Sequence, residues 1–163
     1  MEKFNIIEAI DIAMEAEAKA REFYLSSAAK VNNDRGKNLL NQLADFEKNH
    51  FDRLSDLKQS LQGEAGYIEY KGTKFLPFSA GPVSEVSGKL EANKSDVLDI
   101  LGLAIDAEDK AYNRYMEMAG KIDDPRGKEM FTRFAEEEKA HRRILSDEFY
   151  YMSNKGGLWF WGD

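Results

Sequence analysis

The sequence contains the motif Glu-x-x-His twice, as Glu47-Lys48-Asn49-His50 and as Glu138-Lys139-Ala140-His141, 91 residues apart. The residues around the two motifs align without a gap, and self-similarity at one fixed offset indicates an internal repeat. We place its two copies at residues 4–62 and 95–153. The aligned pairs outside the motif are residues 16–20 with 107–111, Tyr24 with Tyr115, 35–37 with 126–128, and 54–56 with 145–147.

The residues around both motifs follow a helical period. Phe131, Phe134, Glu138, His141 and Leu145 are three or four positions apart, which places them on one face of a helix. Three further segments show comparable spacing. The sequence therefore predicts four helices, near residues 4–31, 35–62, 96–122 and 125–151.

The connections between these helices predict how they pack. The turns at 32–34 and 123–125 are short, so the helices that they join should be antiparallel neighbours. The segment 63–94 is long, and we expect it to run along the bundle as a crossover, because two separate helical hairpins could not bury their apolar stripes. The predicted fold is all-α, an antiparallel four-helix bundle with one long crossover between helices 2 and 3. We assign it to a single domain over residues 1–163.

The composition excludes several classes of protein. The 163 residues contain no cysteine, which rules out thiolate zinc sites and iron–sulfur clusters. A formal net charge of −7 argues against nucleic-acid binding, which needs a basic surface. No apolar run is long enough to span a bilayer, and the N-terminus lacks the basic start of a secretory signal. We therefore expect a cytoplasmic protein.

Glutamate interrupts the apolar stripe of every predicted helix, at positions where a bundle normally keeps leucine. Burial of an ionised carboxylate without a partner is costly, and carboxylates that face one another would also repel. Two divalent cations would balance four carboxylates and two neutral imidazoles. The Glu-x-x-His spacing puts both side chains of a motif on one helix face. The predicted metal ligands are Glu17, Glu47, His50, Glu108, Glu138 and His141.

The donor atoms of these side chains narrow the choice of metal. Carboxylate oxygen with imidazole nitrogen suits iron or manganese, and zinc is chemically possible, whereas magnesium and calcium rarely use imidazole. One Glu-x-x-His motif alone is a weak signal, because short motifs also match by accident. The cost of burying carboxylates on all four helices favours the metal interpretation, and two iron ions are the expected cofactor.

These motifs resemble those of the ferritin-like di-iron carboxylate proteins, and most closely the rubrerythrin branch. The resemblance covers residues 4–151. It rests on Glu17 followed by Tyr24, on Glu108 followed by Tyr115, and on the two Glu-x-x-His motifs.

The resemblance implies a different role for each kind of ligand. Glu17 and Glu108, on the first and third predicted helices, would be terminal ligands. The two motif glutamates would bridge the two ions. The two motif histidines would each bind one ion.

Two departures from the rubrerythrins concern reactivity. Rubrerythrins carry a rubredoxin domain whose four-cysteine iron site feeds electrons to the di-iron pair, and a chain without cysteine lacks such a site. They also have one more glutamate on the third helix, one turn after the main ligand, which takes part in peroxide chemistry. Ala111 occupies that place here, so the resemblance does not imply full rubrerythrin peroxidase activity.

Three other features carry predictions of their own. We interpret Tyr24 and Tyr115 as core residues that hydrogen-bond a carboxylate near the metals, in preference to redox-active phenols. We interpret Glu136 and Glu137 as solvated surface. The aromatic tail, residues 156–161, is expected to pack on the bundle or on a second subunit.

The leading hypothesis is a non-haem di-iron protein that reacts Fe(II) with dioxygen or peroxide, with an external electron donor. Its purpose would be peroxide removal, iron oxidation or another oxidation. The alternatives are an iron-binding or storage protein without turnover and a structural bundle with an empty site. We expect a homodimer, and neither a nucleic-acid nor a membrane partner.

Overall fold

The computed structural model describes residues 3–32, 34–72 and 94–155. These residues form four helices, which confirms the predicted all-α fold. Each helix lies within a few residues of its predicted range. They are α1 (Ile6–Lys30), α2 (Asp34–Gln62), α3 (Lys94–Lys121) and α4 (Pro125–Lys155).

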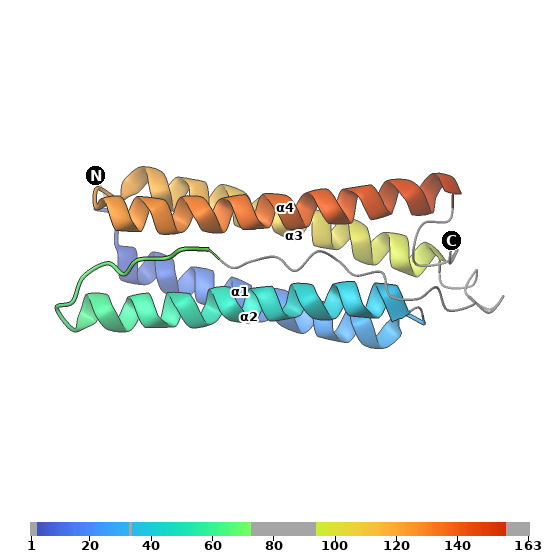
Figure 1. Ribbon diagram of the computed structural model, residues 1–163, viewed down its shortest axis with the longest axis horizontal. Coiled ribbons are helices and arrows are strands. Elements are labelled where there is room, and N and C mark those ends of the chain that lie inside the picture. Colours follow the sequence, from blue (N-terminus) through green and yellow to red (C-terminus); the bar gives the residue numbers. More distant parts are fainter. Residues whose placement is uncertain (1–2, 33, 73–93, 156–163) are drawn as a thin grey trace.

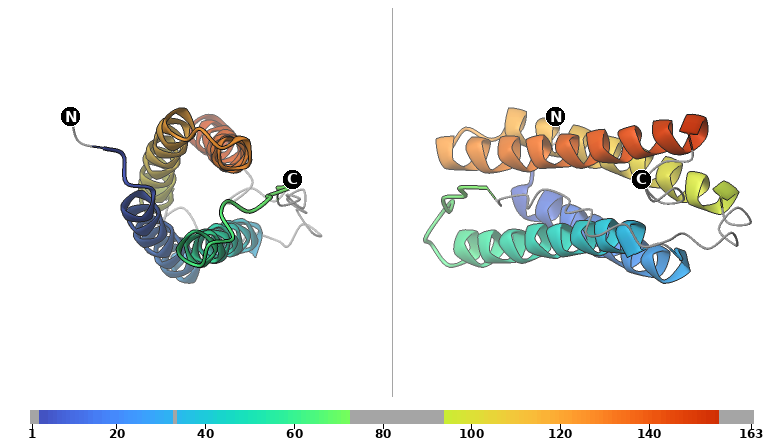
Figure 2. Two further views of the ribbon diagram at one scale, coloured as in Figure 1. Left: turned by 90° about the vertical axis from the view of Figure 1, so that its left-hand side faces the viewer. Right: turned by 45° about the vertical axis from the view of Figure 1, so that its right-hand side comes forward.

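The helices are packed as two antiparallel pairs. Helix α1 lies against α2, and α3 lies against α4, so each copy of the sequence repeat forms one pair (Figure 1). The two pairs face each other along their length, and α2 and α3 run in the same direction, as a crossover between them requires (Figure 2). None of the described helices has an apolar stretch that could cross a membrane.

The helix starts are explained by local sequence. The side chain of Asn5 accepts a hydrogen bond from the backbone N–H of Glu8 and so caps α1. Asp124 accepts one from the backbone N–H of Arg126 at 2.8 Å. Pro125 then occupies the first position of α4, where its missing N–H costs nothing. The tight turn between α3 and α4 follows from these two residues.

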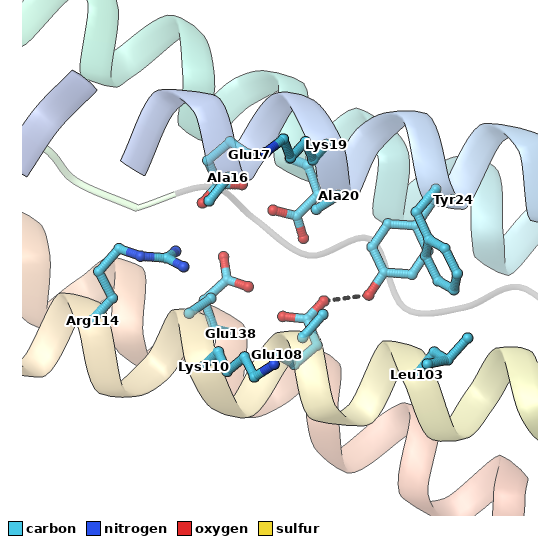
Figure 3. A pocket seen from close by; sticks show the side chains of 14 residues that line it. Ala16, Glu17, Lys19, Ala20, Tyr24, Leu103, Glu108, Lys110, Arg114 and Glu138 are labelled. Atoms are coloured by element: carbon cyan, nitrogen blue, oxygen red, sulfur yellow. Dashed lines mark hydrogen bonds between the residues drawn. The ribbon is translucent and has the colours of Figure 1, made fainter. Parts of the chain in front are cut away.

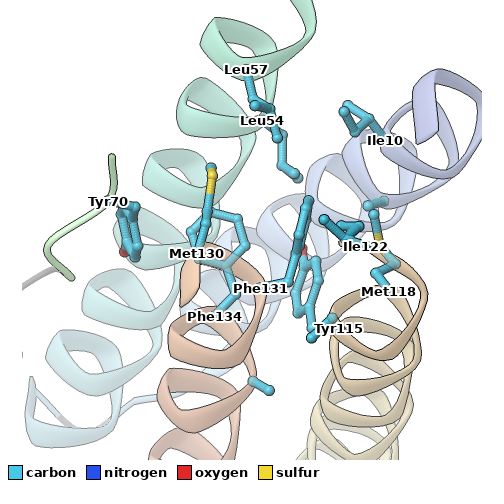
Figure 4. Packing of buried hydrophobic residues seen from close by; sticks show 13 residues of the cluster. Ile10, Leu54, Leu57, Tyr70, Tyr115, Met118, Ile122, Met130, Phe131 and Phe134 are labelled. Atoms are coloured by element: carbon cyan, nitrogen blue, oxygen red, sulfur yellow. The ribbon is translucent and has the colours of Figure 1, made fainter. Parts of the chain in front are cut away.

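The apolar core consists of two clusters, one toward each end of the bundle. One contains Tyr24, Leu43 and Leu145 among its buried residues. The other contains Leu54 and Phe134 and is rich in aromatic rings (Figure 4). Along α2 and along α4, the predicted metal ligands lie between the residues that belong to one cluster and those that belong to the other. Water is therefore excluded from both sides of this polar layer.

The first ten residues of the predicted crossover are described. Gly63 donates its backbone N–H to the carbonyl of Gln59 and ends α2, and the chain then turns back toward α4. There the ring of Tyr70 packs edge-on against Phe134 with centroids 4.7 Å apart. The remainder of the predicted crossover, 73–93, and the aromatic tail lie outside the described residues.

The contact of this segment with α4 predicts that position 127 must stay glycine. A Cβ on Gly127 would lie 2.7 Å from both Ile122 Cγ2 and the ring of Tyr67. Although alanine favours helix, we expect Gly127→Ala to lower the free energy of unfolding by about 1–3 kcal/mol, because the added methyl overpacks this contact. Gly102→Ala is the matched control, since no atom of the described residues lies within 4 Å of its added Cβ. It should raise the free energy of unfolding by about 0.5–1 kcal/mol. Urea unfolding followed by circular dichroism measures both, and equal effects would contradict the packing described here.

Candidate metal centre

All six predicted metal ligands point into one buried layer between the two helix pairs. Each helix contributes a glutamate, and α2 and α4 also contribute a histidine because three residues nearly complete a helical turn. Four glutamates that are almost fully buried at the middle of a bundle are unusual, since charged side chains are rarely buried without a partner. The exposed fractions are Glu17 2%, Glu47 2%, His50 0%, Glu108 2%, Glu138 1% and His141 0%.

The six side chains form two groups that share two members. In each group, one donor atom per residue can be chosen so that all of them lie within 4.8 Å of one another. Glu47 and Glu138, from α2 and α4, belong to both groups. The first group is completed by Glu17 and His50, and the second by Glu108 and His141.

The distances around the two histidines are short. His50 Nδ1 lies 2.6 Å from Glu138 Oε1 and 3.4 Å from Glu17 Oε1. His141 Nδ1 lies 3.6 Å from a carboxylate oxygen of Glu47 and 3.6 Å from one of Glu108. In both histidines, therefore, the nitrogen that faces the predicted glutamate ligands is Nδ1.

The buried donor atoms fit a binuclear metal site. Several of them have no hydrogen-bond partner among the described residues, and each such atom costs about 1–3 kcal/mol in a dry interior. Metal coordination would satisfy them, and oxygen and imidazole donors together suit a transition metal such as iron or manganese. The atoms are Glu17 Oε2, Glu47 Oε1, His50 Nδ1, Glu108 Oε2 and Glu138 Oε1.

Two tyrosines hold the outer carboxylates in place across the bundle. The hydroxyl of Tyr24 on α1 donates to Glu108 Oε1 on α3 at 2.5 Å (Figure 3). The hydroxyl of Tyr115 on α3 donates in turn to Glu17 Oε1 on α1. Each tyrosine thus links one copy of the repeat to the other, and the second oxygen of its carboxylate has no hydrogen-bond partner among the described residues. Burial, followed by the charge of the nearest carboxylate, raises the pKa of both phenols, so both keep the proton that they donate.

Without metal, the layer must hold protons to limit its charge. Burial, together with Glu138, raises the pKa of Glu108 to about 8. Burial and the surrounding carboxylates also raise the pKa of Glu47 well above its usual range. Burial alone would raise the pKa of Glu138, but its contacts with Glu108 and His50 hold that pKa well below the ordinary value of a glutamate. Burial alone would lower the pKa of both histidines, but the facing carboxylates raise it.

One carboxylate in contact with the layer is not among the residues that the sequence predicts. Glu137 was interpreted as solvated surface, which is wrong: its side chain is 14% exposed and its Oε2 lies 2.6 Å from His50 Nε2. The hydroxyl of Tyr70 donates to the same carboxylate at 2.8 Å. An ionised carboxylate only accepts, so Glu137 would accept a hydrogen from His50 Nε2. In a neutral imidazole this leaves the lone pair on Nδ1 for a metal ion. Glu136, by contrast, is exposed as expected.

A signal for Glu137 was present in the sequence. Glu137 lies three residues after Phe134 and four residues before His141. The spacing of three and four that selected Glu138 therefore also places Glu137 between two buried residues of the same helix. The buried face of α4 is wide enough to include both glutamates.

Comparison with known proteins agrees with this geometry. The family model described as Rubrerythrin matches residues 2–71 and 99–155. The chain belongs to the rubrerythrin family. A hypothetical protein from Pyrococcus furiosus has a similar solved structure, with a TM-score of 0.71 and 27% sequence identity over 93% of this chain and 92% of that chain. No curated protein matches the sequence.

Membership in the rubrerythrin family agrees with the buried donor groups, which have the geometry of a carboxylate-bridged di-metal site. The 163 residues contain no cysteine and hence no four-cysteine rubredoxin site. Within this rubrerythrin-family chain, both glutamates that the two donor groups share come from Glu-x-x-His motifs.

The protons held by the metal-free layer predict how its stability depends on pH. The pKa of Glu108 is about 8 in the folded chain against 4.5 for an ordinary glutamate, so the folded state holds this proton more tightly. The raised pKa therefore adds stability to the folded state. This added stability is fully present below the pKa of the unfolded chain and is lost as the pH rises through about 8. The raised pKa values of the histidines act in the same direction, while Glu138 is ionised in both states above pH ~5.

We therefore expect the melting temperature of the metal-free protein to fall between pH 5.5 and pH 8.5, with each pKa unit worth about 1.4 kcal/mol at most. Circular dichroism at both pH values measures it. Glu108→Gln should reduce this dependence, because the amide stays neutral, whereas Glu136→Gln at the exposed neighbour of Glu137 should not. A melting temperature that rises with pH would show that the layer does not hold these protons.

The contact of Glu137 with His50 predicts a loss of metal affinity at one donor group. Glu137→Gln removes the charge that fixes the ring of His50, and loss of such an outer partner typically weakens metal binding about 10–100-fold. Competition titration with a chelator and a metal such as Zn(II) would measure two affinities per chain. We expect the weaker binding in only one of them, and Glu136→Gln is again the matched control. Equal weakening of both would mean that Glu137 acts on the whole layer.

Proposed function

We propose that this chain is a non-haem di-iron protein that reacts Fe(II) with dioxygen or peroxide. The observation that supports this most is the pair of buried Glu/His groups that share Glu47 and Glu138. In this proposal Glu47 and Glu138 would be shared by two ions, and Glu17 and Glu108 would each hold one of them. Bound iron would supply the electrons that reduce the oxidant.

The surrounding residues support this chemistry through what they fix and exclude. Tyr24 and Tyr115 each hold one oxygen of an outer carboxylate, so its other oxygen is directed without ordering cost. Glu137 orients His50 and sets its tautomer. The two apolar clusters keep bulk water from the ends of the layer, which strengthens every electrostatic interaction within it.

The partners of this reaction are also part of the proposal. An external electron donor would return the iron to Fe(II), since the sequence has no cysteine for a relay of its own. Ala111 leaves no carboxylate one turn after Glu108, which favours oxidation of iron or of another molecule over dedicated peroxide removal. A cytoplasmic location and a homodimer remain predictions.

Rapid mixing tests the proposal. Protein that is loaded anaerobically with two Fe(II) per chain should be oxidised by peroxide or dioxygen at least tenfold faster than free iron, as followed by stopped-flow absorbance. Glu138→Gln removes a shared carboxylate charge and should abolish this advantage, whereas Glu136→Gln should keep it. If two ions bind but oxidation is not faster, the result would contradict the proposal and favour an iron-binding protein without turnover. If no ion binds, it would favour a structural bundle with an empty site.

A further inference from the structure

A pocket with a volume of about 340 Å³ opens along the seam between α1 and α3 and reaches the carboxylates of the polar layer (Figure 3). It is lined by residues of both helices and by Glu47 and Glu138 from the opposite pair. One water molecule occupies about 30 Å³ in the liquid, and dioxygen and peroxide are not much larger. Pockets of about 300–1,000 Å³ are typical of organic ligands. This pocket is therefore much larger than the proposed oxidants need.

The pocket exists because small side chains line the seam. Ala16 and Ala20 on α1 and Ala107 and Ala111 on α3 all line it. Ala111 occupies the place where the resemblance to rubrerythrins expects a further glutamate, so an acidic group is replaced by apolar space. At one end of the pocket Leu103, which is 61% exposed, extends the apolar lining.

The charged side chains of the seam are basic, apart from the carboxylates at its base. Lys19, Lys110 and Arg114 all line the pocket. Lys19 forms an ion pair with Glu15 at 3.0 Å, but neither Lys110 nor Arg114 forms one with any residue that the structure describes. Figure 3 shows the guanidinium of Arg114 extending from α3 toward the carboxylates. A guanidinium without a partner at the edge of an apolar pocket is suited to bind a carboxylate in a bidentate way.

The residues are arranged along the seam in a fixed order. Arg114 and Leu103 lie eleven positions apart on α3, which corresponds to about 16 Å at 1.5 Å per residue. Ala107, Glu108 and Ala111 lie between them along the helix. Glu17 and Glu108, each 2% exposed, also line this space, and each has a buried Oε2 without a hydrogen-bond partner in the described chain. The seam thus combines the cation of Arg114, the apolar side chains of the alanines and two metal-ligand candidates in one pocket.

We propose that the seam between α1 and α3 binds a small amphipathic monoanion, such as a medium-chain carboxylate, with its acid group at Arg114 and its apolar body over Ala111 and Ala107. This inference rests on the proposed function, because metal ions must first neutralise the glutamates beneath the ligand. The bound anion would lie next to the carboxylates of Glu17 and Glu108, which are the proposed outer metal ligands. The organic substrate of an oxidation would need to lie there.

Binding of octanoate tests this proposal without any activity measurement. The protein is first loaded with two metal ions per chain, verified by elemental analysis, and then titrated by calorimetry. We expect octanoate to bind with one molecule per chain, octan-1-ol at least tenfold more weakly, and octylammonium not at all. Failure to take up metal would refute the proposed function and this site together. Full metal uptake without octanoate binding at millimolar concentration would refute the site alone.

Matched variants locate the bound molecule. Ala111→Leu fills the pocket and should abolish octanoate binding, whereas Ala140→Leu places the same side chain on the exposed face of α4 and should not. Arg114→Gln should weaken octanoate at least tenfold and leave octan-1-ol unchanged, with Arg143→Gln as its exposed control. Metal content checks that each variant is folded.

Two further outcomes would overturn the proposal. Unchanged octanoate binding in Ala111→Leu would place the molecule elsewhere. A dimer that Leu103→Glu dissociates, as measured by sedimentation, would mean that a second copy of the chain covers the seam instead.

Discussion

Four carboxylates and two imidazoles lie in one buried layer of this bundle, and the layer must be neutralised for the helices to pack. Glu108 and Glu47 meet this need by taking up protons when no metal is bound, as their raised pKa values indicate. Two divalent cations would neutralise the same charge and displace those protons. Metal binding and proton release would therefore be one equilibrium, and the structure on either side of the layer has to be stable enough to support it.

The two apolar clusters provide that stability. They lie toward opposite ends of the bundle, so the helices are held together on both sides of the polar layer. The layer also depends on them, because the electrostatic interactions inside it would weaken if water entered from the ends. Access from the side is different: the seam between α1 and α3 has alanines where leucines could have closed it. The two apolar clusters thus cover the layer at both ends of the bundle, whereas the layer stays open at the seam between α1 and α3.

The helices and the six convergent side chains could be predicted from the sequence because both depend on spacing within one helix. Residues three and four positions apart share a face, whatever the rest of the chain does. Glu137 was missed because its environment depends on a contact across the bundle with His50, 87 residues away in sequence. The pocket was missed for a similar reason. Ala16 and Ala107 each look like ordinary helix residues, and only the packing of α1 against α3 shows that they leave a space together.

The repeat makes the two donor groups nearly equivalent, but a difference in sequence beside the two histidines distinguishes them. Position 137 aligns with position 46, where the second copy has glutamate and the first has phenylalanine. Glu137 bonds the outer nitrogen of His50, whereas the ring of Phe46 packs edge-on against His141 with centroids 4.8 Å apart. The segment after α2 has no counterpart in the second copy, and it brings Tyr70 to this same glutamate. A carboxylate beside one histidine and an aromatic ring beside the other give the two imidazoles different basicity. Two ions bound here would therefore differ in affinity and potential, although their nearest ligands are the same in kind.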